Sequence, residues 1–286
     1  GIYLRYLRPG KVMEVSAIGV ALLLFAIISG RWVAESDWGQ IFHLDRPLLA
    51  ILVIAYGFIA AVLPVWLLLA PRDYLSTFMK VGVIAMLAIA IVIVQPVVTA
   101  PPVSVFASNG DGPVFSGHLF PFLFVTIACG ALSGFHAMIS SGTTPKLVEK
   151  EGQTRMIGYG GMLMESFVAI MALVAAVTID QGIYFAMNSA STATQGTVEG
   201  AAAFVNSLGL TGVNVTPETL SETARQVGEH SIVSRTGGAP TLAVGLANIM
   251  HGLIPGEGMM AFWYHFAIMF EALFILTSVD AGTRVA

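Results

Sequence analysis

This 286-residue sequence is poor in cysteine and in charged residues. Its single cysteine, Cys129, excludes a disulfide framework and a cysteine-based metal cluster. Charged side chains make up only 10% of the residues, whereas ordinary soluble domains have about 25%. Hydrophobic residues reach 56%, and the mean hydropathy is +0.82. The composition therefore predicts an all-α, polytopic integral membrane helical bundle.

The sequence also lacks the short motifs that carry most enzyme chemistry. It contains no HxxxH, HExxH or GxSxG pattern and no P-loop. These absences predict that the protein is not an enzyme and needs no cofactor or metal, which leaves an intramembrane metalloenzyme as a poor alternative. The formal net charge of −4, with no basic patch, gives no support to a nucleic-acid partner.

Long apolar runs are abundant, and six of them approach the roughly 20 residues that a helix needs to cross a bilayer. We expect residues 1–286 to form a single transmembrane domain that is a fragment of a longer protein. A further apolar stretch at 240–254 is shorter and ends in Pro255-Gly256, so we expect it to re-enter or lie on the surface. The six expected spans are 12–28, 48–70, 81–98, 119–141, 156–179 and 259–278.

The basic residues predict the orientation of these spans. Nine of the thirteen lysines and arginines fall on one side, which the positive-inside rule makes cytoplasmic. The connection at 180–238 is then extracytoplasmic. It either covers the outer ends of the helices or forms a lid over a substrate entrance. Within it, we expect one amphipathic helix at 217–228, with Thr216 as its N-cap. The nine basic residues are Arg5, Arg8, Lys11, Arg72, Lys80, Lys146, Lys150, Arg155 and Arg284.

Two carboxylates lie well inside the expected spans, away from the span ends. Glu165 follows Arg155 by about ten residues, or roughly 15 Å along a helix, which places it near the bilayer midplane. Small residues at steps of three and four put it on a face that contacts protein or water. A carboxylate at that depth costs at least about 2.5–3.5 kcal/mol, so Glu165 is the leading candidate proton carrier, and an interhelical hydrogen bond is the alternative. Glu271 in the last span is the second candidate.

A histidine and two serines share one face of the fourth expected span. Ser133, His136 and Ser140 are spaced i, i+3 and i+7, and Gly130, Gly134 and Ala137 continue the same narrow small-residue face. Such a face allows close helix packing, so His136 is either a hydrogen-bonded interhelical residue or a group that handles substrate or protons.

Hydroxyl groups follow where this span ends. Thr143 and Thr144 precede Pro145, and we expect Thr144 to cap a short cytoplasmic helix. Hydroxyls beside a helix start can also hold a carboxylate, so plain capping and substrate contact both remain open. At the other end of the chain, Asp280 and Arg284 are four residues apart, which favours an interfacial ion pair over a site.

Long and unusual sequence segments along the whole chain resemble those of the carbon starvation protein A family of bacterial inner-membrane transporters. The resemblance implies uptake of peptides or pyruvate by proton symport during starvation, and by analogy the inverted-repeat fold of amino acid–polyamine–organocation transporters. The family's chain is longer, and we expect this sequence to match its middle. The segments that carry the resemblance lie at 1–10 (GIYLRYLRPG), 63–77 (LPVWLLLAPRDYLST), 119–146, 157–172 (IGYGGMLMESFVAIMA), 184–188, 237–245 (GGAPTLAVG) and 262–284.

The sequence thus predicts a secondary transporter of the bacterial inner membrane with protons, lipid and a peptide or small carboxylate as partners. A membrane-embedded sensor of the same ligand is the alternative from another class, and a channel is a third. The substrate and proton-coupling candidates are Glu165, Glu271, His136, Ser133, Ser140, Thr143 and Thr144.

Overall fold

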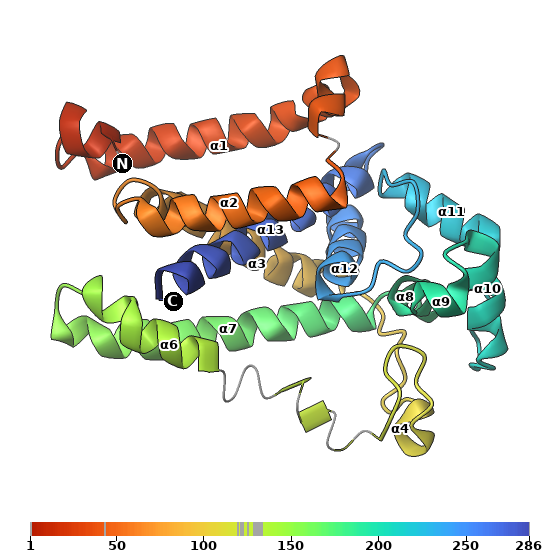
Figure 1. The fold of residues 1–286 in the computed structure, drawn as a ribbon. Helices are drawn as coiled ribbons and strands as arrows, with labels where there is room; N and C mark the ends of the chain where they lie inside the picture. The colour runs from red at the N-terminus through yellow and green to blue at the C-terminus, as the bar shows by residue number, and fades with distance from the viewer. Residues whose placement is uncertain are drawn as a thin grey trace. The chain divides into compact units, whose positions relative to one another are not determined.

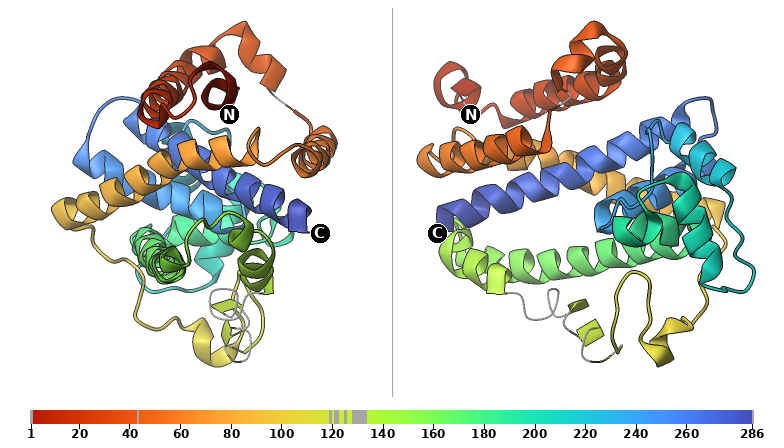
Figure 2. Two further views of the ribbon diagram at one scale, coloured as in Figure 1. Left: turned by 90° about the vertical axis from the view of Figure 1, so that its left-hand side faces the viewer. Right: turned by 45° about the vertical axis from the view of Figure 1, so that its right-hand side comes forward.

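A computed structural model describes residues 2–42, 44–118, 120, 123–124, 126–127 and 134–285. Throughout this described part the regular structure is helical, without a strand, as the composition predicts. The chain divides into two compact units, which Figures 1 and 2 draw as ribbons coloured along the sequence. Unit 1 contains Gly1–Val83, Phe135–Val148 and Ala272–Ala286, and unit 2 contains Ile84–Gly134 and Glu149–Glu271.

Four of the described helices are long and apolar enough to cross a membrane by length and composition. Their windows overlap the expected first, third, fifth and sixth spans. α2 (Arg46–Val62) is shorter, because the predicted span 48–70 contains a break around Pro64 that ends the helix. Ten of the 23 residues of the predicted span 119–141 lie outside the described residues, and the longest described stretch of this span belongs to α6 (Gly134–Gly142). The four long helices are α1 (Val12–Glu35), α3 (Leu69–Val94), α7 (Thr154–Val177) and α13 (Met259–Val285).

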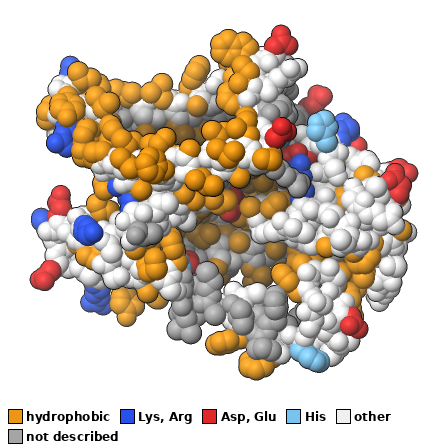
Figure 3. Space-filling model, viewed as in Figure 1, with side chains coloured by type: hydrophobic (Ala, Val, Ile, Leu, Met, Phe, Trp, Pro, Cys, Tyr) orange, Lys and Arg blue, Asp and Glu red, His pale blue; other side chains and the backbone are white. Residues whose placement is uncertain are grey.

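The surfaces of these helices are apolar, as lipid contact requires. Phe25 on α1 is 64% exposed, and Phe58 on α2 is 69% exposed. Hydrophobic side chains also gather along these two helices in the space-filling view (Figure 3). We therefore describe the long helices as membrane-spanning.

Unit 1 is held together by polar contacts between its helices as well as by apolar packing. The Ser16 hydroxyl on α1 lies 2.9 Å from the Tyr74 hydroxyl on α3, so one hydrogen bond joins these helices. Glycines let other helices approach closely, because a Cβ at Gly57 would lie 3.3 Å from Thr283 and one at Gly142 would lie 3.3 Å from Val285. The shorter segments of unit 1 are η1 (Tyr3–Leu7), η2 (Asp37–Phe42) and η3 (Thr144–Lys146).

The small-residue faces expected around Gly134, Gly158 and Gly161 meet no other element among the described residues. No described atom lies within 4 Å of a Cβ built at any of these three glycines. The predicted close contact at Gly134 therefore stays a prediction, whereas Gly142 at the opposite end of α6 is in close contact with Val285.

Unit 2 contains a polar, well-buried group of short helices between α7 and α12 (Gly238–Leu253). The sequence predicted one helix in this connection, at 217–228, and the structure has it as α11 with the Thr216 hydroxyl accepting from the Thr219 amide at 3.2 Å. Three more helices were missed, although Asp180 and Thr197 cap two of them in the same way. The segments are η4 (Glu151–Gln153), α4 (Phe106–Asn109), α8 (Gln181–Asn188), α9 (Ser191–Thr194), α10 (Val198–Ser207) and α11 (Pro217–Gln226).

The apolar stretch 240–254 forms α12, which is buried inside unit 2. Gly245 allows this helix to approach α7, because a Cβ there would lie 2.7 Å from the backbone carbon of Ala175. On the α8 side, the Asn188 amide donates to the Thr241 hydroxyl at 2.9 Å. The expectation that this stretch re-enters the membrane or lies at its surface stays a prediction.

Candidate functional site

A cluster of charged side chains joins α3 to α13 within unit 1. Its centre is Asp280, whose side chain is fully buried. The Arg284 Nε donates to Asp280 Oδ1 at 2.9 Å, and the Arg72 Nη2 lies 3.5 Å from Asp280 Oδ2. The same Arg72 nitrogen donates to Asp73 Oδ1 at 3.0 Å. One buried carboxylate thus faces two arginines inside a membrane-length pair of helices.

The cluster continues along both helices through Lys80. Its ammonium donates to the Thr277 hydroxyl at 3.3 Å and lies 4.5 Å from the centre of the Phe274 ring. Thr277 in turn donates to Asp73 Oδ1 at 3.3 Å. Lower numbers on α3 meet higher numbers on α13, so these two segments run antiparallel. We call Arg72, Asp73, Lys80, Asp280 and Arg284 the charge cluster.

Helix α2 supplies the remaining partners of the two arginines. Arg72 donates to the Tyr56 hydroxyl on α2. Arg284 Nη2 donates at 2.8 Å to the carbonyl of Leu63, the residue that follows α2. That carbonyl would otherwise lack an intrahelical donor, so Arg284 also caps the end of a helix.

Not every polar atom of the charge cluster is satisfied. Arg72 Nε and Asp280 Oδ2 are buried without a hydrogen-bond partner among the described residues. Charged groups removed from water cost several kcal/mol each, and geometry that leaves atoms unpaired recovers only part of that cost. Charged residues inside membrane helices typically mark substrate or ion pathways, so the charge cluster is a candidate functional site.

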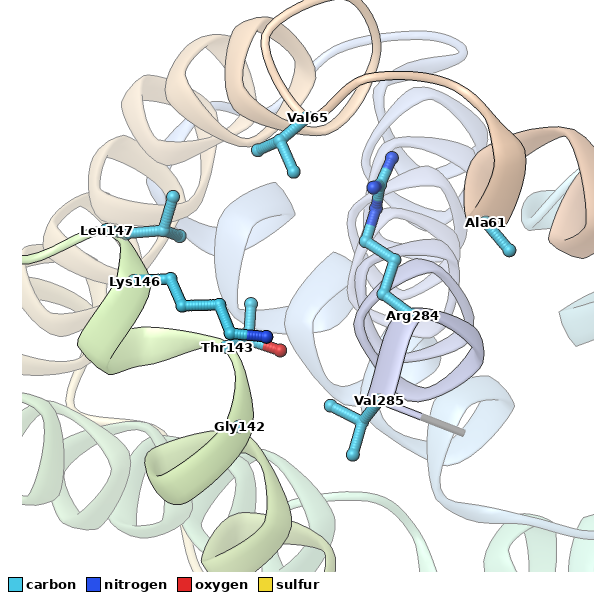
Figure 4. A pocket seen from close by; sticks show the side chains of 8 residues that line it. All are labelled: Ala61, Val65, Gly142, Thr143, Lys146, Leu147, Arg284 and Val285. Atoms are coloured by element: carbon cyan, nitrogen blue, oxygen red, sulfur yellow. The ribbon is translucent and has the colours of Figure 1, made fainter.

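A cavity of about 250 Å³ opens beside the charge cluster, where three helices of unit 1 end (Figure 4). In Figure 4 the Lys146 side chain extends alongside Thr143, and Arg284 faces the cavity from α13. Apolar side chains form the rest of the wall. The lining residues are Ala61, Val65, Gly142, Thr143, Lys146, Leu147, Arg284 and Val285.

The structure brings some of the predicted site residues to this cavity. Thr143 lines it, and Thr144 follows at the start of η3. The predicted cap is wrong by one residue, because Thr143 and not Thr144 holds the N-cap position, and its hydroxyl makes no capping hydrogen bond. The reason is that α6 runs on to Gly142, and the Thr143 amide still bonds to the Ile139 carbonyl at 3.1 Å.

The other candidates on α6 do not reach the cavity wall. His136 and Ser140 are exposed. The Ser140 hydroxyl donates to the Ala137 carbonyl at 3.0 Å, an ordinary bond back to its own helix. Ser133 lies outside the described residues, so its predicted role stays a prediction.

The two predicted proton carriers belong to unit 2. Glu165 is exposed on α7 and makes no hydrogen bond or ion pair with the described residues. Glu271 is half-buried on α13. Their proposed roles in proton coupling remain predictions.

Unit 2 has a larger, mainly apolar cavity of about 690 Å³ beside the end of α7. Tyr184 and Phe185 of α8 line it together with Phe106 of α4, and burial raises the pKa of the Tyr184 phenol. An extended segment closes one side, where the Thr99 amide donates to the Val177 carbonyl at 2.9 Å. This volume falls within the roughly 300–1,000 Å³ of common ligand pockets.

A bidentate ion pair lies within unit 2, between Glu229 and Arg235. Arg235 donates to both carboxylate oxygens of Glu229, at 2.9 and 2.7 Å. Burial lowers the Arg235 pKa, but the bonds to Glu229 outweigh it and the net pKa is raised, so this arginine stays charged. The described residues contain no group of three or more histidine, cysteine, aspartate or glutamate side chains arranged to hold a metal ion.

Sequence reasoning missed most of the charge cluster. The sequence placed Arg72 and Lys80 in a cytoplasmic loop, and it placed the Asp280–Arg284 pair at the membrane interface. The pair exists, but Asp280 is fully buried. A signal was present in the spacing, because Asp73 and Lys80 are seven residues apart and so lie two helical turns apart on one face.

Comparison with known proteins gives strong matches over the whole chain. The model of the family described as "Carbon starvation protein CstA" matches residues 1–286. A "Peptide transporter CstA" of Mycobacterium tuberculosis is 64% identical over 100% of this chain and 38% of its own length. A protein of the same description from Escherichia coli K12 is 62% identical, over 100% of this chain and 41% of its own. The "Pyruvate/proton symporter BtsT" of Escherichia coli K12 is 50% identical, over 99% and 42%.

The chain spans about two fifths of the length of these relatives. The expectation that it corresponds to the middle of the family's sequence is not supported by these comparisons. No solved structure matches this chain.

Proposed function

Because the chain belongs to the carbon starvation protein CstA family, we propose that the full-length protein is a secondary active transporter of the bacterial inner membrane. It takes up peptides or pyruvate by proton symport when nutrients are scarce. The observation that carries this proposal is the identity of 50–64% to proteins named as a peptide transporter and a pyruvate/proton symporter. The alternative of a nutrient sensor is not favoured, because the named relatives are transporters.

The structure supports this proposal through its buried charges. α3 and α13 are long enough to cross a membrane, and both carry members of the charge cluster. Ionisable groups at such positions are costly, and membrane proteins keep them mainly for substrate and ion pathways.

Within this function we propose Glu165 as the main proton carrier and Glu271 as the second. An exposed carboxylate on an apolar helix faces either lipid or the remainder of the full-length protein, and only the second surrounding is inexpensive. Glu165→Gln keeps the size of the side chain and removes its charge and its proton. We expect this variant of the full-length protein to be expressed normally and to lose proton-driven accumulation of substrate.

The experiment uses full-length protein in proteoliposomes, with radiolabelled pyruvate and a radiolabelled dipeptide added in turn. Uptake is measured with and without an inward proton gradient, and Glu151→Gln, at the cytoplasmic end of the same segment, is the control. Accumulation that follows the gradient supports the proposed function. Ligand binding without movement would refute transport, and a Glu165→Gln variant with wild-type uptake and pH dependence would remove Glu165 from the mechanism.

A further inference from the structure

We propose that the cavity at the ends of α2, α6 and α13 binds the carboxylate group of a small organic anion. This inference rests on the proposed transport function and assigns one subsite to it. Lys146, Arg284 and Thr143 would supply the donors, and the surrounding aliphatic side chains would contact the rest of the ligand.

The first argument is charge balance. The charge cluster contains three cations and two carboxylates, so it carries an excess of one positive charge, and its member Arg284 lines the cavity. An uncompensated charge away from water is expensive. An anion that enters next to Arg284 supplies the missing negative charge, and it does so without displacing any contact that holds α3 to α13.

The second argument is Lys146. Its side chain is exposed and extends along the cavity wall, and its ammonium makes no hydrogen bond or ion pair with the described residues. The Thr143 hydroxyl beside it likewise makes no capping bond. A carboxylate is the ligand that uses an ammonium, a guanidinium and a hydroxyl together, because it accepts several hydrogen bonds at once.

One effect opposes this assignment. Helices α2 and α6 end here, and each carboxyl terminus brings a partial negative charge of about half a unit. Arg284 already bonds to the Leu63 carbonyl at the end of α2, which offsets one of these ends. The full positive charge of Lys146 then exceeds the partial negative charge that remains at the end of α6. The net charge at the cavity therefore favours an anion, and the preference is weak. Weak binding suits a site on the side where Lys146 and Arg284 predict the cytoplasm, since an imported substrate must leave there.

The size of the cavity limits the ligand. Its volume of about 250 Å³ lies below the roughly 300–1,000 Å³ of pockets for drug-sized ligands. A small monocarboxylate fits such a space whole, whereas a peptide could place only its C-terminal end there. Both kinds of ligand would place a carboxylate in the cavity, and an experiment can distinguish a free monocarboxylate from the C-terminus of a peptide.

The test measures binding of radiolabelled pyruvate to purified full-length protein in detergent. Lys146→Gln removes one charge-assisted hydrogen bond, so we expect about tenfold weaker binding. Lys150→Gln is the matched control, because Lys150 is an exposed lysine in the same connection and does not line the cavity. Ala61→Phe fills the cavity and should also weaken binding, whereas Val62→Phe, at a residue 67% exposed, should not.

Competition with unlabelled ligands identifies the source of the carboxylate. Competition by acetate but not by a dipeptide supports a free monocarboxylate, and competition by a dipeptide but not by its C-terminal amide supports a peptide end. Equal competition by the amide would overturn the assignment. Wild-type pyruvate binding in both Lys146→Gln and Ala61→Phe would overturn it as well. Loss of gradient-driven uptake with binding retained would instead count against the proposed transport and leave this site intact.

Discussion

Replacing Asp280 by asparagine tests whether its carboxylate holds unit 1 together. The substitution keeps the shape of the side chain and removes a charge that is fully buried between Arg72 and Arg284. Breaking a buried ion pair by removing one partner costs about 3–5 kcal/mol, because the other charge is left uncompensated. Arg72 retains Asp73 at 3.0 Å, but Arg284 keeps only the Leu63 carbonyl. We therefore expect a loss near the lower limit, about 3 kcal/mol.

A second substitution separates this explanation from a simple loss of packing. In the Asp280→Asn background, Arg284→Met removes the stranded cation and keeps an aliphatic side chain of similar reach. We expect the double variant to be more stable than the single one, because apolar replacement of a whole buried pair is often neutral or stabilising. Asp73→Asn is the control, since Asp73 is one-third exposed and its loss should cost at most about 1 kcal/mol.

The assay is equilibrium unfolding of the full-length protein in mixed micelles, followed by circular dichroism. The expected order of stability is wild type, Asp73→Asn, the double variant and then Asp280→Asn. Wild-type stability of Asp280→Asn would refute the reasoning. So would a double variant that is less stable than the single one, because the cost would then come from packing and not from charge.

Two further predictions concern unit 2. Gly245→Ala places a methyl group against the backbone of Ala175, so we expect a loss of about 1–3 kcal/mol. Gly161→Ala meets no described atom within 4 Å, and because alanine is the better helix former it should keep or slightly raise the unfolding midpoint. Equal midpoints for the two variants would contradict the packing. Thr216→Ala removes the cap of α11 and should cost about 1 kcal/mol. Hydrogen exchange at the Thr219 amide should then be about fivefold faster, with Thr216→Ser close to wild type, and unchanged exchange in Thr216→Ala would show that the cap contributes nothing.

Patterns of neighbouring residues were enough to predict some helix positions and the cap of α11. The expected span at 156–179 coincides closely with α7 because its apolar run is bounded by polar residues at both ends. The cap at Thr216 was found because Thr-Pro-Glu is a signature of a helix start. Both features depend on neighbouring residues, which the sequence displays directly.

The charge cluster depends on residues far apart in the sequence, and so it was missed. A hydropathy window excluded Arg72 and Lys80 from the third span, whereas α3 begins at Leu69 and contains both. Charges can stay in that helix because α13 supplies their partners, and no local pattern reveals this pairing. The predicted residue Thr143 was found from the hydroxyls near the helix end, but its neighbour in the cavity, Arg284, lies on another helix.

The distance in sequence between α3 and α13 sets a problem for biosynthesis. Arg72 bonds to the Leu276 carbonyl, 204 residues later in the chain. At about 5–20 residues per second, a ribosome needs roughly 10–40 s to add those residues. During that time α3 must enter the bilayer with only Asp73 and the Tyr56 hydroxyl of α2 as partners for Arg72, or wait beside the translocon until α13 arrives. The nascent chain therefore depends on the membrane insertion machinery for as long as its charges remain unmatched, and truncation before Asp280 is expected to mark the product for quality-control proteolysis.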